Sequence, residues 1–330
     1  MQTLTDFEIR DLGPAGLDSF TPLLATYTEK ALAALHDRVA PACLGDFLLF
    51  RASQILRGKD AHVVAITAEG CPVGLACWTS LAWDTQMFGF PAARLDFLLV
   101  QRGATSEIQH HLIAAVLERA RKHGIRHLIS RVDSSNLEVI DAFEQAGFET
   151  IDEIETFSLQ PVRRSDMPDF TQDITTRLFA EPDLEQILQI ARSSYVFDRF
   201  HSDAAIDSRI ADRIHEEWMR NSCRGSAADA VVVAAEGSTV LGYATCKADR
   251  ESRRHLGLGI GSIVLVATAE HARKRGVARA CTMAAVRWFQ DRGSEAIQVG
   301  TQRRNLPAAR LYEKCGFRSV ASTQILRKVL

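Results

Sequence analysis

The sequence predicts an α/β protein made of two copies of one fold in tandem. Residues 136–148 recur as residues 305–317 at a constant offset of 169, and each copy has an asparagine first, an aromatic residue seven positions later and Gly-Phe at its end. Patterns typical of helices and strands alternate through both halves. The 330 residues suit two domains of about 165 residues each. We therefore expect domains at residues 1–165 and 166–330, joined by the polar, proline-containing stretch at 160–170.

The second copy has the clearer elements. Apolar residues at helical spacing predict a helix over 182–195, and the four-residue steps from Ile206 to Trp218 predict another. A third helix is expected over 277–292, and a short one begins at Pro307. Apolar runs predict strands near 230–236, 240–248, 260–267 and 296–301.

The first copy has the same order of elements. A helix is expected over 106–123. Strands are expected near 62–68, 73–79, 94–100 and 127–132. Alternating strands and helices indicate a central sheet covered by helices in each domain.

Composition excludes several classes of protein. A net charge of −2 argues against a nucleic-acid or acidic-membrane partner. The apolar runs are shorter than the ~20 residues that a transmembrane helix needs, and Asp6 and Glu8 near the start argue against a secretory signal. Seven cysteines without a CxxC pair argue against a disulfide framework and a zinc cluster. We expect a cytoplasmic protein with reduced thiols.

The sharpest chemical signal is a basic loop between a strand and a helix at 263–291. A helix N-terminus offers unpaired N–H groups and a partial positive charge, which together can hold a pyrophosphate. Gly276 allows close approach of the backbone to phosphate, and Ala278 leaves the next turn unobstructed. Arg273, Lys274 and Arg275 add positive charge around the anion.

With its surrounding elements, this loop resembles the R-x-x-G-x-A loop of the GNAT superfamily of N-acetyltransferases. The Asn305-x6-Tyr312-x4-Gly-Phe317 segment that follows fits the same family. The resemblance implies two tandem GNAT-like domains, each a central mixed, mostly antiparallel sheet flanked by helices, and acetyl-CoA as co-substrate, without a metal. The residues expected to bind it are Val264, Leu265, Val266, Arg273, Lys274, Arg275, Gly276, Val277, Ala278, Arg279, Asn305 and Ala308.

Transfer of an acyl group to an amine needs an oxyanion donor and a proton for the thiolate leaving group. A backbone N–H near Val266 is a candidate oxyanion donor. By resemblance to GNAT enzymes, Tyr312 is expected to be the general acid, because a phenol with a pKa of about 10 stays protonated at neutral pH. Asn305, by the same resemblance, is expected to bind the pantetheine arm. The alternative for Tyr312 is a core tyrosine, and for Asn305 a helix cap.

The first copy has lost these groups. At the offset of 169, Gly276 corresponds to Glu107, which would repel phosphate, and Tyr312 corresponds to Phe143, which has no proton to give. We therefore expect the first domain to be non-catalytic and to support the second domain or shape the acceptor site.

Two segments indicate which class of amine accepts the acetyl group. Residues 198–203 and 217–229, with a patch at 83–90, resemble dTDP-fucosamine acetyltransferase and its relatives, which act on the 4-amino group of a nucleotide-linked deoxysugar. The resemblance makes a small-molecule amine the expected partner. The expected acceptor-binding residues are Arg199, Arg220, Asn221 and Arg224, and the expected proton relays are His201 and Asp203.

Other interpretations stay open at this point. The acceptor could be another small-molecule or protein amine, or the chain could be a CoA-binding regulatory module without turnover. A metal is not expected, because His201-x-Asp203 and His110-His111 lack further ligands at metal spacing. Tandem domains packed as a pseudo-dimer would make a monomer plausible, and a homodimer is the alternative.

Overall fold

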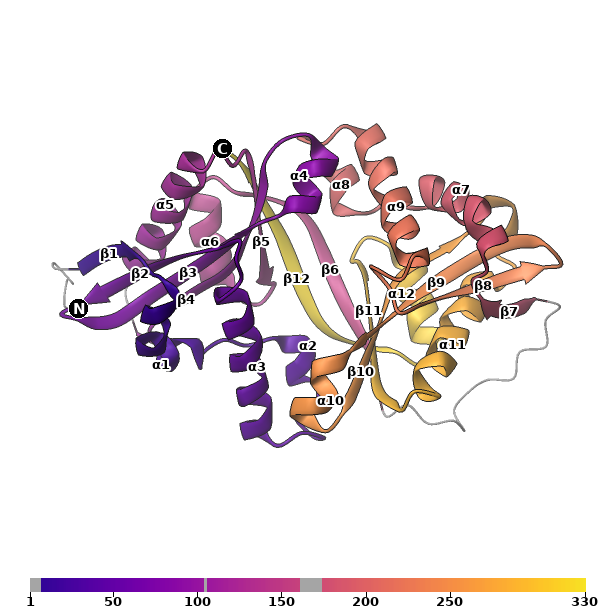
Figure 1. The fold of residues 1–330 in the computed structure, drawn as a ribbon, viewed down its shortest axis with the longest axis horizontal. Helices are drawn as coiled ribbons and strands as arrows, with labels where there is room; N and C mark the ends of the chain where they lie inside the picture. Colours follow the sequence, from indigo (N-terminus) through magenta and orange to yellow (C-terminus); the bar gives the residue numbers. More distant parts are fainter. Residues whose placement is uncertain (1–6, 104–105, 161–173) are drawn as a thin grey trace. The chain divides into compact units, whose positions relative to one another are not determined.

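A computed structural model describes residues 7–103, 106–160 and 174–330 of the chain (Figure 1). It divides into two compact units: unit 1 comprises Met1–Glu153 with Ser322–Leu330, and unit 2 comprises Ile154–Ala321. This division differs from the single boundary expected near residue 165, because each unit contains a strand from the other half of the chain. The expected linker at 160–170 lies outside the described residues, apart from Gln160.

Unit 1 has a six-stranded sheet among the described residues. Its order is β1-β2-β3-β4-β5-β12, with β4 and β5 parallel and the other pairs antiparallel. The strands are β1 (Phe7–Asp11), β2 (Ala61–Ala68), β3 (Cys71–Ser80), β4 (Ala92–Val100), β5 (His127–Asp133) and the greater part of β12 (Arg318–Val329). The helices are η1 (Pro14–Phe20), α1 (Thr21–Leu24), α2 (Lys30–Ala33), α3 (Pro41–Leu56), α4 (Ala82–Phe88), α5 (Ser106–Lys122) and α6 (Leu137–Gln145).

Unit 2 repeats this plan. Its sheet order is β6-β11-β10-β9-β8-β7, with β10 and β11 parallel and the other pairs antiparallel. The strands are β6 (Glu149–Leu159), β7 (Thr175–Leu178), β8 (Ala230–Glu236), β9 (Thr239–Asp249), β10 (Gly259–Thr268) and β11 (Ser294–Gln302). The helices are η3 (Glu181–Asp183), α7 (Leu184–Ser194), α8 (Arg199–Ser202), α9 (Ser208–Cys223), α10 (Arg250–Leu256), η4 (Glu270–Ala272), α11 (Val277–Gln290) and α12 (Leu306–Lys314). The predicted tandem of mixed, mostly antiparallel sheets with flanking helices is confirmed.

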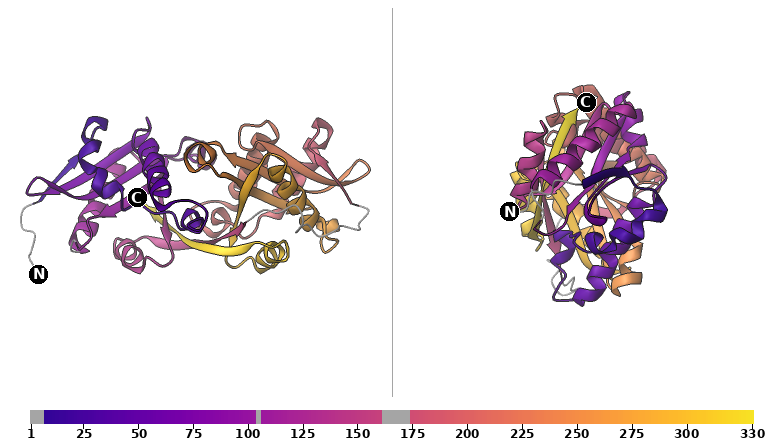
Figure 2. Two further views of the ribbon diagram at one scale, coloured as in Figure 1. Left: turned by 90° about the horizontal axis from the view of Figure 1, so that it is seen from below. Right: turned by 90° about the vertical axis from the view of Figure 1, so that its left-hand side faces the viewer.

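The two halves of the chain exchange their final strands. In unit 1, β12 pairs with β5 from Thr323 opposite Asp133 to Val329 opposite His127. In unit 2, β6 supplies the strand next to β11, with Leu159 opposite Ile297. Figure 2 shows the last strand, in yellow, ending among the purple elements of the first half. Each sheet is therefore completed by the strand that follows the other copy's Gly-Phe pair.

The core of unit 2 follows from its sequence pattern. Residues 231–235 of β8 are all buried, as expected for a strand covered on both faces. Helix α11 buries a broad apolar face from Val277 to Phe289 against the sheet. Helix α9 has a strong helical period and buries the stripe that contains Ala211, Ile214 and Met219. These two helices position the site described below.

The expectations about the cysteines and about transmembrane helices can also be compared with the structure. The seven cysteines are free thiols. Within the described ranges, none of the helices is long and apolar enough to cross a membrane.

Candidate active site

The parallel strands β10 and β11 separate partway along their length. Their pairing runs from Gly259 opposite Ser294 to Ile263 opposite Val299, after which β11 continues beside β6. At the same level β10 has a bulge against β9, and the Leu265 N–H donates to Thr245 Oγ1 at 2.9 Å. A bulge leaves backbone groups outside the ladder. The structure thus places the predicted Val264–Val266 segment at a V-shaped opening in the sheet.

The basic loop leads from this opening to the start of α11. Gly276 is the N-cap residue and has φ of 84°, in the left-handed region, and no side chain caps this end of the helix. Arg273 and Lys274 are exposed, whereas Arg275 forms an ion pair with Glu236. The structure therefore has an N-terminal helix end with several N–H groups and adjacent cations, which is suited to an anion.

Helix α12 supplies the other two predicted groups. Asn305 is its N-cap, and its Oδ1 accepts from the Ala308 N–H at 3.3 Å. Asn136 caps α6 in the same way in unit 1. Because both copies use this asparagine as a cap, the cap accounts for Asn305 without a ligand. Tyr312 is buried next to Phe157 and Phe317.

A group of tyrosine hydroxyls lies inside unit 2. Tyr195 OH and Tyr243 OH are 3.2 Å apart. Burial raises the pKa of Tyr195 well above its usual value, and Tyr243, Tyr312 and Asp198 raise it further. Burial also raises the pKa of Tyr312, followed by a smaller effect of Cys315. Tyr312 therefore stays protonated throughout the physiological pH range.

The predicted acceptor residues fall into two groups. Arg199, His201 and Asp203 lie on or just after α8, at one end of α9. His201 contacts Asp212 near the start of α9. Arg220, Asn221 and Arg224 lie at the other end of that helix. At 1.5 Å per residue, the twelve residues from Asp212 to Arg224 span about 18 Å. The structure does not bring the two groups together.

The contacts of these residues also differ from the expectation. Arg220 pairs with Glu216 and Glu217 along its own helix. Asp203 is buried, and its Oδ1 accepts from the Ala205 N–H, which stabilises a turn. The Cζ atom of Arg199 lies 4.1 Å from the centroid of the Phe200 ring, over its face.

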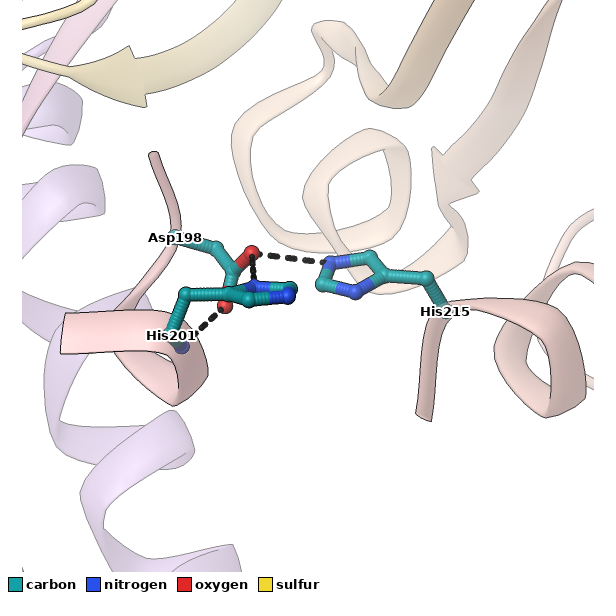
Figure 3. A group of neighbouring side chains, drawn as sticks. All are labelled: Asp198, His201 and His215. Carbon is teal, nitrogen blue, oxygen red and sulfur yellow. Dashed lines mark hydrogen bonds and ion pairs between the residues drawn. The ribbon is translucent and has the colours of Figure 1, made fainter. Parts of the chain in front are cut away.

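His201 belongs to a cluster that the sequence did not reveal (Figure 3). Its Nδ1 lies 2.6 Å from Asp198 Oδ2, and its Nε2 lies 3.1 Å from Asp212 Oδ1. His215 Nε2 lies 3.8 Å from the same Asp198 oxygen, and the His215 ring stacks on Tyr195 at 4.3 Å. His215 was missed because it falls on the buried stripe of α9, where helical periodicity alone indicates a core residue.

The segment that carries this cluster is tied to the start of α12. The Arg304 guanidinium donates to the Phe197 carbonyl oxygen at 2.8 Å and also to Ser202 Oγ. Arg304 directly precedes the cap residue Asn305. The cluster and the helix of Tyr312 are thus connected within one unit.

Unit 1 has the same opening but different groups in it. There β4 and β5 pair only from Ala92 opposite His127 to Leu95 opposite Ser130, and β4 has a bulge at Asp96. Asp96 stands 169 residues before Leu265, and its carboxylate accepts from Thr79 Oγ1 and Arg94 Nε. The shape is retained, but a carboxylate has replaced the apolar residue at this level.

Comparison with known proteins identifies the family that part of the chain resembles. Residues 184–317 match the model of the acetyltransferase (GNAT) family. The matched residues lie within unit 2, so this unit is similar to the GNAT acetyltransferases, and the chain as a whole has the fold of tandem GNAT proteins.

The particular relatives are more distant. The chain is 32% identical over 108 residues to mycothiol acetyltransferase of Pseudarthrobacter chlorophenolicus, covering 33% of this chain and 31% of that protein. It is 29% identical over 136 residues to the spore coat polysaccharide biosynthesis protein SpsD of Bacillus subtilis, covering 41% and 44%. The similarity therefore spans less than half the length of either relative.

Two solved structures resemble the whole chain. One is a GCN5-related N-acetyltransferase from Sphaerobacter thermophilus, with 18% identity and a TM-score of 0.62 over 99% of this chain and 97% of that one. The other is a tandem GNAT protein from the clavulanic acid biosynthesis pathway, with 15% identity and a TM-score of 0.58 over 98% of both chains. At these identities the likeness establishes the fold.

Proposed function

We propose that this protein transfers the acetyl group of acetyl-CoA to a primary amine in unit 2. The observation that carries the proposal is the joint placement of three features. These are the opening between β10 and β11, the uncapped N-terminal end of α11, and the buried Tyr312 on α12. The opening suits an extended pantetheine arm, and the helix end with its basic loop suits the diphosphate. Arg273, Lys274, Gly276, Val277 and Ala278 would contact that diphosphate.

The proposed reaction is direct attack of the neutral amine on the thioester carbonyl. The N–C bond forms, the C–S bond breaks, and one amine proton replaces the acetyl group on sulfur. A backbone N–H at Val264–Val266 would stabilise the oxyanion, because the β10 bulge turns this edge away from β9.

Tyr312 would stabilise the thiolate leaving group. Its raised pKa keeps the phenol protonated, but it also makes complete proton transfer to a thiolate with a pKa of about 8.5 unfavourable. The role that fits both facts is a hydrogen bond donated to the departing sulfur, with the net proton coming from the amine. Of the predicted relays, Asp203 stabilises a turn and His201 lies between two carboxylates. The proposal requires neither of them, because an amine can arrive deprotonated.

For the acceptor, we propose the 4-amino group of a nucleotide-linked deoxysugar. Support comes from the likeness of residues 198–203 to dTDP-fucosamine acetyltransferase and from the match to a polysaccharide biosynthesis protein. Arg199 lies in that segment, whereas Arg220, Asn221 and Arg224 lie too far along α9 to contact the same part of a ligand. Another small-molecule or protein amine is the alternative acceptor, and a CoA-binding regulatory module is the alternative class.

The test is release of CoA thiol from acetyl-CoA over a panel of amines that includes dTDP-4-amino-4,6-dideoxysugars. Tyr312→Phe is expected to lower kcat about 10²-fold or more with little change in acetyl-CoA affinity. Tyr27→Phe in unit 1, which removes a phenol bonded to Glu29 at 2.8 Å, is the matched control and should match the wild type. Turnover only on other amines would remove the sugar assignment. Acetyl-CoA binding without turnover on any amine would favour the regulatory module.

A further inference from the structure

Three side chains with metal-ligating atoms converge in unit 2. Asp198 stands at the N-cap of α8, His201 lies on α8, and His215 lies on α9. Asp198 Oδ2 is 2.6 Å from His201 Nδ1 and 3.8 Å from His215 Nε2. One ligand atom from each residue lies within 4.8 Å of the other two, as Figure 3 shows.

Each of these groups is oriented by a second partner. His215 Nδ1 lies 3.2 Å from the Ala211 carbonyl oxygen, and His201 Nε2 lies 3.1 Å from Asp212 Oδ1. In each ring the other nitrogen faces Asp198, and a metal ion bound there would require the proton to be on His201 Nε2 and on His215 Nδ1. Asp198 Oδ1 accepts from the backbone N–H groups of residues 200 and 201, which directs Oδ2 toward the rings. Outer partners of this kind are typical of metal ligands.

The electrostatics favour a bound cation. His215 is 3% exposed and Asp198 is 7% exposed. Both side chains are therefore largely shielded from water, and the nitrogen of His215 that faces Asp198 is held inside unit 2. Asp198 is a buried carboxylate with two imidazole nitrogens facing one of its oxygens, and a cation between these three groups would compensate its buried negative charge.

The distances are compatible with zinc. Two ligands at 2.0–2.1 Å from a tetrahedral zinc ion are separated by roughly 3.3 Å. The observed separations of 2.6 and 3.8 Å lie on either side of this value and all three ligand atoms lie within 4.8 Å of one another, so side-chain rotations that change these separations would be needed to bind zinc. Two imidazoles and one carboxylate are an established donor set for zinc with an open fourth position.

We propose that Asp198, His201 and His215 form a binding site for one zinc ion, with the fourth position open to water or the acceptor. The sequence argued against a metal because His201 has no second ligand at short spacing. The fold supplies one from α9, fourteen residues further along the chain. The ion would hold α8 against α9 and would occupy His201, so this residue could not relay a proton. Because the ring of Tyr195 stacks on that of His215, the ion would lie one ring away from Tyr195.

The test uses the full-length chain, stripped of metal with a chelator and then titrated with Co²⁺. We expect one equivalent of Co²⁺ to give the visible absorption of a four-coordinate site and to be displaced by one equivalent of Zn²⁺. Zinc should also raise the Tm of the wild type. Neither readout depends on acetyl transfer, so failure of this proposal and failure of the proposed function are distinguishable.

Variants identify the ligands. His201→Ala and His215→Ala are each expected to weaken zinc binding at least tenfold and to abolish the zinc-dependent Tm shift. Asp198→Asn keeps a capping oxygen but loses the carboxylate, and it should also weaken binding. His36→Ala is the control, because it removes a histidine from an exposed pair with Asp37 at 2.9 Å and should change nothing.

Two results would overturn the proposal. The first is a wild type that binds no more Co²⁺ or Zn²⁺ than the His201→Ala/His215→Ala double variant; the three groups would then be only a hydrogen-bonded network. The second is full metal binding by each ligand variant. Circular dichroism of every metal-free variant checks folding, and His215→Gln replaces His215→Ala if the latter does not fold.

Discussion

The strongest structural prediction concerns the glycine that opens α11. Gly276 has φ of 84°, and an L-residue in the left-handed region costs about 1–2 kcal/mol. The change Gly276→Ala therefore either strains the backbone at this position or shifts the loop out of the conformation in which its N–H groups can bind phosphate. Because 1.4 kcal/mol corresponds to a factor of ten, we expect acetyl-CoA binding to weaken about tenfold.

Calorimetric titration with acetyl-CoA measures the binding effect, and chemical unfolding measures the strain. Gly124→Ala is the matched control, since Gly124 in unit 1 has φ of 72° and nothing within 4 Å of an added Cβ. Both variants should lose similar stability, but only Gly276→Ala should lose affinity. Equal loss of affinity in both, or unchanged binding in Gly276→Ala, would refute the assignment of this loop to the diphosphate.

Three further predictions follow from single contacts. Glu107→Gln in unit 1 should leave acetyl-CoA affinity and turnover near wild type in the same assays, and a large change in affinity would contradict a non-binding unit 1. Arg177→Ala should lower the free energy of unfolding by about 1–2 kcal/mol at pH 7, because Arg177 donates to Asp183 at 2.5 and 2.8 Å but is itself partly exposed. Arg177 lowers the pKa of Asp183 in the folded state below its usual 3.8. This stability is therefore present above pH 3.8 and is lost as the pH falls below it, so the stabilities of the wild type and the variant should approach each other only below that pH. Gly261→Ala should cost about 1–3 kcal/mol in thermal unfolding, since its Cβ would lie 2.4 Å from the Phe289 ring, and an unchanged Tm would show that the ring can move aside.

The fold could be predicted largely from the sequence, because local signals and the repeat agree. The strand expected near 230–236 is β8 with the same bounds, and the helix expected over 106–123 ends one residue earlier. Helix α10, at the basic run 250–255, was not among the expected helices; it is capped by Asp249, which accepts from the N–H groups of residues 251 and 252. Short helices depend on such caps more than on periodicity.

The exchange of final strands could not be predicted in this way. Phe148 and Phe317 are each followed directly by a long strand, β6 and β12. Which sheet a strand joins is decided by tertiary packing, and no local pattern carries that information.

For the candidate site, sequence reasoning selected residues on one loop and one short helix, and it missed the cluster that tertiary structure brings together. Gly276 and Tyr312 carry recognisable spacing. Asp198 and His215 come from separate helices, and Asp198 resembles an ordinary N-cap. Conversely, Arg220 and Arg224 were grouped with Arg199 because both of their segments resemble one enzyme family, whereas the length of α9 separates them.

The strand exchange also sets an order for folding in the cell. A ribosome makes β12 after the other strands of the described residues, yet β12 fills the place beside β5 in unit 1, whose other strands are made much earlier. During synthesis the nascent unit 1 therefore exposes the unpaired edge of β5 until nearly the whole chain has emerged. Such an edge is open to pairing with other chains, so chaperones would be needed most by the early half of the protein. For the same reason, loss of the last nine residues should unfold the amino-terminal half before the half to which they are joined.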